Sequence, residues 1–297
     1  MRTLTVSLLA CALLLAACKP TSFTAPPADP TAPTKPAKPA VANDNLNAVL
    51  WMQSSAEYGA VCETVYGAAT AQLDAALADP ERDALVPGER DTPATGLPAA
   101  VVMDVDETVL DNSPYQARLV VNGQEFEPGS WDAWVAEKQA QPLPGVVAFA
   151  QAAAARGITV IYISNRAEHL QAATIANLKA VGLPVKDDGV FLGKGTVVPG
   201  CEQSGSDKDC RRRLAGREYR VLMQFGDDLR DFVQITDNTP KARGQLAGQY
   251  RDWFGQRWWV LPNPSYGTWE RAVFGNDSKL PLAKRRAQKW AALDLAK

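Results

Sequence analysis

The sequence predicts an α/β fold in which a parallel β-sheet is flanked by helices. Short apolar runs that suit buried strands occur at residues 99–103, 158–163 and 220–225. Segments with helical spacing of their apolar residues lie between these runs. Strands that alternate with helices in this way pair in parallel through right-handed crossovers. Two aspartates follow the first run, and the carboxyl edge of such a sheet is where ligands bind.

The first 17 residues predict an export signal. Arg2 supplies a short positive region, and residues 4–17 are apolar but too few to span a bilayer, which takes about 20 residues. The segment ends in LAAC, which resembles the bacterial lipobox, with Cys18 as the lipidated first mature residue. Ordinary cleavage after Ala-x-Ala, with Cys18 incidental, is the alternative. Because Lys19 follows, and not Asp, the usual Gram-negative sorting rule predicts an outer-membrane lipoprotein that is exposed to the periplasm or the outer surface.

Residues 18–44 are rich in Pro, Ala and Thr, which predicts an extended tether. The remainder, residues 45–297, predicts one domain that begins with helices at 45–77. The segment 110–145 is too long for a plain βα loop and predicts a small cap over the site. The other expected elements are helices at 146–155 and 168–181 and short strands at 190–192 and 258–261, in addition to the three apolar runs.

Composition limits the classes of partner. Hydrophobic residues make up 46% of the chain, enough for one sizeable core or a core plus a small cap. The formal net charge of −2 gives no electrostatic case for nucleic acid or an anionic membrane surface as a partner. The basic cluster at residues 211–213 is expected to be a solvated face or part of a phosphate site.

The cysteines suggest one disulfide. Cys201 and Cys210 flank a polar loop and could close it in an oxidising compartment, a gain of roughly 2.5–3 kcal/mol. Cys62 occupies an apolar position of a predicted helix and is expected to be a buried free thiol. Metal binding by cysteine is not expected, because no CxxC occurs and His169 is the one histidine.

The most informative stretch reads VVMDVDETVLDN at residues 101–112. Asp104 and Asp106 emerge where the predicted strand ends. Two carboxylates this close repel each other unless a cation neutralises them, and Mg²⁺ is typically held by one or two carboxylates plus phosphate oxygens. One aspartate could then be a nucleophile while the other transfers protons. A lone DxD is more often an acidic solvated turn, so other motifs of the chain must show whether these aspartates form a catalytic site.

Four segments in order resemble the phosphotransferases of the haloacid dehalogenase superfamily: DVDETVLDN, then SNR at 164–166, SDKDCRRR at 206–213 and GDDLRDF at 226–232. These versions are similar to one branch, the class C acid phosphatases, the bacterial lipoprotein acid phosphatase and 5′-nucleotidase family. Residues 49–66 and 263–270 also resemble that branch, so the resemblance covers residues 45–274. It implies a Rossmann-like sheet of the haloacid dehalogenase type.

The resemblance also implies roles for the first motif. Asp104 would attack phosphorus, form an aspartyl-phosphate and bind the metal. Asp106 would be the general acid and base, and its backbone carbonyl would be a metal ligand. Thr108 would orient the loop.

Two further groups would contact the phosphoryl group. Ser164 would donate a hydrogen bond to a phosphoryl oxygen, although a plain helix N-cap is the alternative. Lys208 would neutralise charge, because KDCRRR resembles the family's K-x-x-R-R ending. Lys194, in LGKG, is the runner-up. The family often has two lysines near Lys208, the first in KS, and this chain has Gly205 there, so the choice of lysine stays open.

The third motif would complete the metal site. Asp227 would be the second side-chain ligand of the metal. The family usually reads GDN where this chain has GDD, so Asp228 could join the metal shell directly or through water. Asp231 would orient water or the lysine.

Substrate binding is also implied by resemblance. Trp131, Asp132 and Tyr266 match positions that resemble the family's nucleoside pocket, where aromatic faces stack on a base. For any single tryptophan, core packing is an equal alternative, and Trp253, Trp258 and Trp259 are expected in the core. The remaining expected substrate-binding residues are Asn112, Asn165 and Arg166.

The sequence therefore predicts a phosphomonoesterase with one Mg²⁺ per chain that acts on small phosphomonoesters, nucleotides first among them. A phosphotransferase with the same catalytic residues is one alternative. A non-enzymatic surface lipoprotein that binds a ligand such as haem is another. The preferred ester and the oligomeric state stay open, with a dimer as one option.

Overall fold

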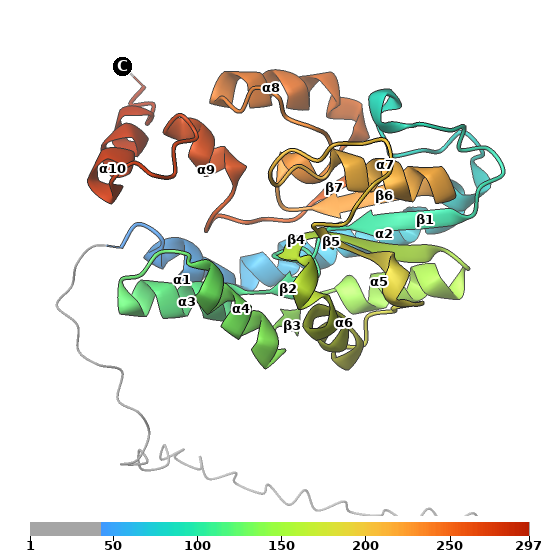
Figure 1. The fold of residues 1–297 in the computed structure, drawn as a ribbon, viewed down its shortest axis with the longest axis horizontal. Helices are drawn as coiled ribbons and strands as arrows, with labels where there is room; N and C mark the ends of the chain where they lie inside the picture. The colour runs from blue at the N-terminus through green and yellow to red at the C-terminus, as the bar shows by residue number, and fades with distance from the viewer. Residues whose placement is uncertain (1–42, 297) are drawn as a thin grey trace, which may run out of the picture. The chain divides into compact units, whose positions relative to one another are not determined.

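A parallel β-sheet lies at the centre of residues 43–296, the part of the chain that this computed structural model describes (Figure 1). Within these residues the sheet has five strands in the order β5-β4-β1-β6-β7, and every neighbouring pair is parallel. The strands are β1 (Ala99–Met103), β4 (Thr159–Ala167), β5 (Phe191–Lys194), β6 (Arg220–Gly226) and β7 (Trp258–Val260). The predicted signal peptide, Cys18 and residues 18–42 of the tether lie outside the described residues.

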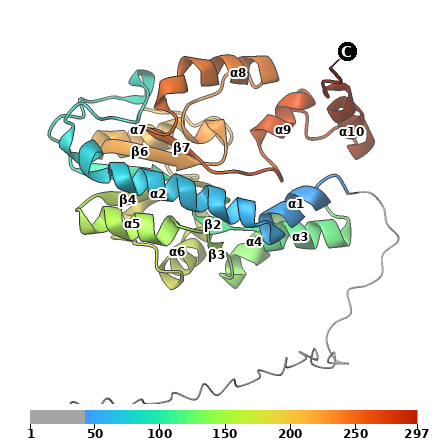
Figure 2. The ribbon, with the colours of Figure 1, turned by 180° about the vertical axis from the view of Figure 1, so that it is seen from behind.

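Helices cover both faces of the sheet (Figures 1 and 2). One face carries α2 (Ala56–Ala78), α5 (Val146–Ala155) and α6 (Gln171–Ala180), and the other carries α7 (Asp209–Glu218) and α8 (Pro240–Gln249). Because successive strand residues point to opposite faces, Val101 and Met103 join one core cluster while Ala100 and Val102 join the other. A strand buried on both faces must be apolar throughout, as β1 is.

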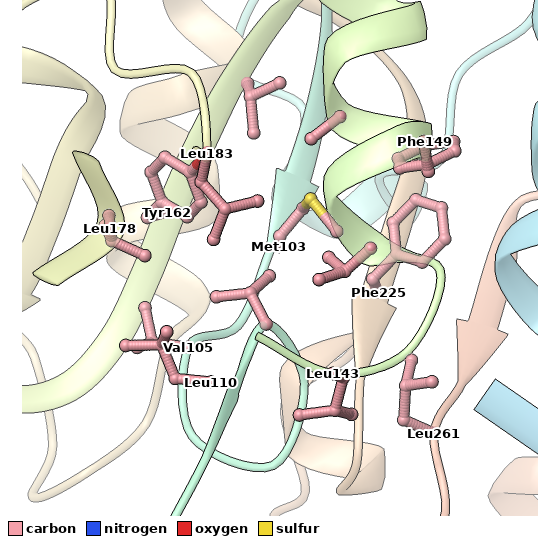
Figure 3. Packing of buried hydrophobic residues seen from close by; sticks show 14 of the residues in the cluster. Met103, Val105, Leu110, Leu143, Phe149, Tyr162, Leu178, Leu183, Phe225 and Leu261 are labelled. Atoms are coloured by element: carbon pink, nitrogen blue, oxygen red, sulfur yellow. The ribbon is translucent and has the colours of Figure 1, made fainter. Parts of the chain in front are cut away.

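The larger core cluster lies under α2 and α5. In α5, Val146, Phe149, Ala150 and Ala153 are buried at helical spacing. Figure 3 shows Phe149 beside Phe225 of β6, and the two ring centroids are 4.6 Å apart. Complete burial of a phenylalanine stabilises the fold by about 1.5–3 kcal/mol, so this layer fixes the helix against the sheet.

The leading helices are α1 (Leu46–Ser54) and α2, and Ser55 separates them. The Ser55 hydroxyl accepts a hydrogen bond from the Tyr58 N–H at 3.1 Å, which is an N-cap. The α2 face toward the core contains Cys62, a buried free thiol as predicted.

The segment between β1 and α5 forms the expected small cap. It contains β2 (Leu110–Asp111), α3 (Ser113–Asn122), α4 (Pro128–Glu137) and β3 (Gln141–Pro142). β2 pairs antiparallel with β3, so the segment leaves the central domain and returns to it at one place.

The predicted fold class is confirmed, with differences in detail. Strand β4 runs on through Ser164, Asn165 and Arg166, so SNR lies in a strand and is not a helix N-cap. Trp258 and Trp259 are buried, and Trp253 is partly buried against Trp258. Outside the cap, the helices that the sequence did not predict are α7, α8, α9 (Thr268–Val273) and α10 (Leu282–Ala291). The 3-10 turns are Pro87–Glu89, Glu168–Leu170, Asp188–Val190, Leu229–Asp231 and Arg251–Trp253. No helix among residues 43–296 combines the length and the apolar character that a membrane crossing needs.

Candidate active site

The candidate site lies at the carboxyl edge of the sheet, beyond β1 and its two neighbours. β1 lies between β4 and β6, so Asp104 emerges between Ser164 of β4 and Asp227, which follows β6. The Asp104 N–H donates to the Phe225 carbonyl at 2.9 Å and extends the β1–β6 pairing by one residue. The parallel topology therefore brings residues that are far apart in sequence to one edge.

Lys208 lies at the centre of a buried group of carboxylates. Its Nζ donates to Asp104 Oδ1 and, at 2.6 Å, to Asp231 Oδ1. The side chains of Lys208 and Asp104 are only 4% and 7% exposed. Burial opposes the charge of Lys208, but Asp104 and Asp231 hold its pKa above the usual value, so the group is an ammonium. Lys194, the alternative lysine, is exposed at the end of β5.

The group contains more carboxyl groups than cationic side chains. Carboxylate oxygens of Asp104, Asp227 and Asp231 lie within 4.8 Å of one another. Burial raises the pKa of Asp104 to about 7 against the opposing charge of Lys208, and Asp231 and Asp106 add to the rise. Burial, then the charges of Asp231 and Asp104, raise the pKa of Asp227 well above its usual value.

These residues fit a divalent cation, because three mostly buried carboxylates have one ammonium among them. Asp227 Oδ2 accepts a hydrogen bond from Asn263 Nδ2 at 2.7 Å, which holds this carboxylate in place. Asp104 and Asp227 would hold the ion with their side chains. Lys208 already bonds to Asp231, which agrees with the expected orienting role of that aspartate.

The structure does not bring Asp228 to this group, which corrects its expected role as a metal ligand. Its carboxylate accepts hydrogen bonds from the Arg230 N–H at 3.0 Å and from the Thr268 N–H at 2.6 Å and hydroxyl. Burial alone would raise the pKa of Asp228, but these donors and Arg243 outweigh it and lower the pKa. Asp228 therefore caps a 3-10 turn and holds the start of α9.

Asp106 and Thr108 lie beside the buried group. Thr108 Oγ1 donates to Asp104 Oδ2 at 3.4 Å, and its carbonyl accepts from the Tyr66 hydroxyl at 2.8 Å, so the loop is held from α2. Asp106 forms an ion pair with Arg166 at 2.8 Å. Ser164 Oγ donates to Asp106 Oδ2 at 3.4 Å. The acid and the hydroxyl that the sequence identified are thus adjacent.

Two of the expected substrate-binding residues, Asn112 and Arg166, are buried and form hydrogen bonds with other residues of the protein. Asn112 is 0% exposed, and its amide contacts Asp106, Leu110, Trp134 and Arg166. Arg166 is 1% exposed. Both are corrected from substrate contacts to internal supports, because neither presents a group to solvent. Asn165 is exposed and accepts from Arg211 Nη2 at 2.8 Å.

The other expected substrate residues come from the cap and from the loop after β7. The Trp131 ring lies under the Arg166 guanidinium, 5.4 Å from its Cζ. Asp132 pairs with His169 at 2.9 Å on the exposed side of the cap. The Tyr266 hydroxyl donates to Glu107 Oε2.

Glu107 is a buried residue of this site that sequence reasoning missed. It is 0% exposed and has a left-handed backbone with φ of 56°. Its carboxylate accepts from the Asn112 N–H at 2.7 Å as well as from Tyr266. Burial, then the charge of Asp106, raise its pKa well above the usual value. In the sequence, its place inside DVDET was the one indication of a role in the site, because the spacing of Glu107 does not distinguish it from other acidic residues.

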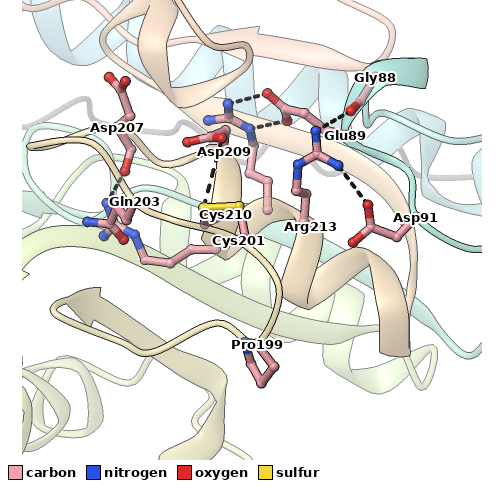
Figure 4. The surroundings of a disulfide bond; sticks show 12 residues. Gly88, Glu89, Asp91, Pro199, Cys201, Gln203, Asp207, Asp209, Cys210 and Arg213 are labelled. Atoms are coloured by element: carbon pink, nitrogen blue, oxygen red, sulfur yellow. Dashed lines mark hydrogen bonds and ion pairs between the residues drawn. A yellow bond between two sulfur atoms is a disulfide. The ribbon is translucent and has the colours of Figure 1, made fainter.

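The basic run at 211–213 is not a solvated face, which corrects that expectation. Arg211 and Arg212 are 0% exposed. Arg211 donates to the carbonyls of Ser164 and Asp207. Arg212 makes a two-bond ion pair with buried Glu89, and both distances are 2.6 Å. Arg213 is the half-buried member and pairs with Asp91 at 2.7 Å (Figure 4).

A disulfide joins Cys201 to Cys210, the pair expected from the sequence (Figure 4). Cys210 lies in the first turn of α7, two residues after Lys208. The bond therefore attaches the loop that precedes Lys208 to the helix that follows it.

Comparisons with known proteins agree with this geometry. The family model described as HAD superfamily, subfamily IIIB (Acid phosphatase), matches residues 14–269. The class C acid phosphatase from Bacillus anthracis, in a crystal structure with tungstate bound, is 33% identical with a TM-score of 0.73. That match covers 84% of this chain and 96% of the other.

Curated plant proteins are more distant relatives. Vegetative storage protein 1 from Arabidopsis thaliana is 27% identical over 46% of this chain and 49% of its own length. Acid phosphatase 1 from Solanum lycopersicum is 24% identical over 44% of this chain and 51% of its own length. The chain thus spans about half the length of these curated relatives.

Proposed function

Because the chain belongs to the acid phosphatases of HAD superfamily subfamily IIIB, we propose that it is a Mg²⁺-dependent phosphomonoesterase that acts through an aspartyl-phosphate on Asp104. The observation that carries the proposal is the buried group in which Lys208 bonds to Asp104 and Asp231, with Asp227 beside them. This group has a nucleophilic oxygen, a fixed ammonium and surplus carboxylates at one sheet edge. Such an arrangement suits phosphoryl transfer, where catalysis is positioning plus electrostatic stabilisation.

In the first step, an Asp104 oxygen attacks phosphorus in line with the leaving oxygen, whose bond to phosphorus breaks. Asp106 donates a proton to that leaving oxygen, and the alcohol departs. In the second step, water attacks the aspartyl-phosphate and gives a proton to Asp106. Inorganic phosphate leaves, and the Asp104 carboxylate is restored.

Charge on the phosphoryl group must be balanced throughout these steps. The Lys208 ammonium lies against Asp104 and is the internal cation of the site. The Ser164 hydroxyl, beside Asp106, would donate to a phosphoryl oxygen. When bound, one Mg²⁺ per chain would neutralise surplus carboxylate charge and stabilise the phosphoryl oxygens. Asp104 and Asp227 would hold it.

We propose nucleotides and related small phosphomonoesters as substrates. Trp131 from the cap and Tyr266 from the loop after β7 supply aromatic rings, and stacking on such rings tolerates any base. We also propose that the chain is a lipoprotein, anchored through Cys18 in the outer membrane of a Gram-negative bacterium. The LAAC segment and the Pro-rich stretch after it support that proposal.

The test is phosphate release by the full chain from AMP, NMN and an aryl phosphate, with Mg²⁺ and with chelator. We expect release that depends on Mg²⁺ and is lost in Asp104→Asn. Lys194→Met is the matched control, since Lys194 is exposed and should leave the rate unchanged. Release that persists in chelator, or in Asp104→Asn, would refute the mechanism.

A further inference from the structure

The two oxygens of the Asp106 carboxylate have unequal surroundings. Oδ1 accepts hydrogen bonds from Arg166 Nε at 2.9 Å and from Asn112 Nδ2 at 3.0 Å, and Arg166 Nη2 lies 2.8 Å from it in the ion pair. Oδ2 accepts one hydrogen bond within the described residues, from the Ser164 hydroxyl at 3.4 Å. One oxygen is therefore saturated with donors, and the other faces the side of Ser164.

The donors on Oδ1 are themselves held in place. The Arg166 guanidinium also donates to Asn112 Oδ1 at 3.2 Å and to Thr174 Oγ1 at 3.3 Å. Asn112 Oδ1 accepts a second hydrogen bond from Trp134 Nε1 at 2.8 Å. Arg166 and Asn112 are both almost fully buried, and a guanidinium presents its donors in a rigid planar fork. Asp106 therefore has little freedom to rotate its carboxylate.

We propose that Arg166, supported by Asn112, is a positioning residue that fixes Asp106 so that Oδ2 faces the leaving group. This inference rests on the proposed function, in which Asp106 protonates the leaving oxygen. With two hydrogen-bond donors and the charge of Arg166 on Oδ1, that oxygen has no free lone pair with which to serve the substrate. Oδ2 lies beside Ser164, whose hydroxyl would contact the phosphoryl group, so it is the oxygen on the reaction side.

The Trp131 ring supports the same guanidinium from the cap. Arg166 of β4 thus contacts both Trp131 of the cap and Asp106 of the loop after β1. Arg166 acts on the reaction through Asp106, because its own buried head does not reach solvent.

The test compares two esters in Arg166→Gln. An alkyl ester such as AMP needs protonation of its leaving oxygen, whereas p-nitrophenyl phosphate releases a stable anion without it. We expect kcat to fall about 10²-fold for AMP and less than about tenfold for p-nitrophenyl phosphate. KM should change little for either ester. Arg156→Gln is the matched control, because it makes the same substitution at an exposed arginine that pairs with Asp74 at the end of α5 and should leave both rates unchanged.

Circular dichroism and thermal melting verify folding. If Arg166→Gln does not fold, Arg166→Lys takes its place, since it keeps the charge but cannot make the fork, and the same selective loss is expected at smaller size. Equal loss on the two esters in either folded variant overturns the proposal. Wild-type protein that is inactive on both esters would refute the proposed function instead, so the two failures are distinguishable.

Discussion

Lys208 is the one ammonium that compensates the buried carboxylates of the described site, so Lys208→Met should expose their repulsion. Its Nζ pairs with Asp104 and lies 2.6 Å from Asp231. Loss of one partner from a buried ion pair costs about 3–5 kcal/mol, because the other charge stays buried without compensation. In a chain of this size, 1 kcal/mol shifts the melting temperature by about 2–4 °C. The metal-free variant should therefore melt about 6–20 °C below wild type.

In the absence of metal, Asp227→Asn should raise the stability of the fold, whereas Lys208→Met lowers it. Burial, Asp231 and Asp104 raise the pKa of Asp227 well above its usual value. A carboxyl whose folded-state pKa is raised contributes stability below its unfolded pKa of about 3.9, and that stability is lost as the pH rises through the folded-state value. At pH 7 the metal-free variant should therefore be more stable than metal-free wild type. With Mg²⁺ at 100 times Kd, wild type should gain about 2.7 kcal/mol and the variant much less.

Thermal and urea unfolding at pH 5 and pH 7, each in chelator and in saturating Mg²⁺, measure both effects. Lys194→Met controls for loss of a lysine as such, since Lys194 is exposed. An unchanged melting temperature for metal-free Lys208→Met would show that the carboxylates do not form an electrostatic unit. If Mg²⁺ stabilises Asp227→Asn as much as it stabilises wild type, Asp227 is not a ligand of the metal.

Four further predictions test separate parts of the molecule. Asp104→Asn should give no acid-stable phosphoenzyme with labelled substrate, and a labelled variant protein would contradict the assignment of the nucleophile. Asp228→Asn should destabilise the protein by about 1–3 kcal/mol at pH 7, because the pKa of Asp228 is lowered in the folded state. That difference should vanish on acidification through this lowered pKa, and urea unfolding at both pH values checks it. Cys201→Ser should lower stability by roughly 2.5–3 kcal/mol, and reductant should lower that of wild type but not of the variant. Cys18→Ser should abolish labelling by a palmitate analogue; if wild type takes up no label, the proposed anchor is wrong.

The fold was predictable because its strands are locally distinctive. β1 is apolar at every position and buried on both faces, and its bounds match the predicted run at 99–103. Helix α5 also matches, since its buried residues follow helical spacing. Helix α8 was missed for the opposite reason, because it has few apolar residues and buries none of them fully.

The position of each motif after a predicted strand indicated which residues lie at the carboxyl edge of the sheet. It did not indicate which of several adjacent aspartates has which role. Asp227, Asp228 and Asp231 follow the same strand. The sequence predicted Asp227 as a metal ligand, Asp228 as a possible second one and Asp231 as a residue that orients water or the lysine. Thr268, 40 residues further on, occupies the Asp228 carboxylate, whereas Lys208 occupies that of Asp231. Such choices depend on partners from distant segments, which no local pattern contains.

The burial of the basic run at residues 211–213 also depends on partners from distant segments. Arginine is almost never fully buried unless it is paired, so three in succession predicted a solvated face or part of a phosphate site. Arg212 is buried because Glu89, 123 residues earlier, meets both arms of its guanidinium. Arg211 is buried because its guanidinium donates hydrogen bonds to the carbonyls of Ser164 and Asp207, even though burial and the charge of Arg212 lower its pKa to about 10. Both arginines follow Lys208 in one helix. That helix therefore holds the end of β4 and Lys208 together, and the arginines form part of the internal frame of the candidate site.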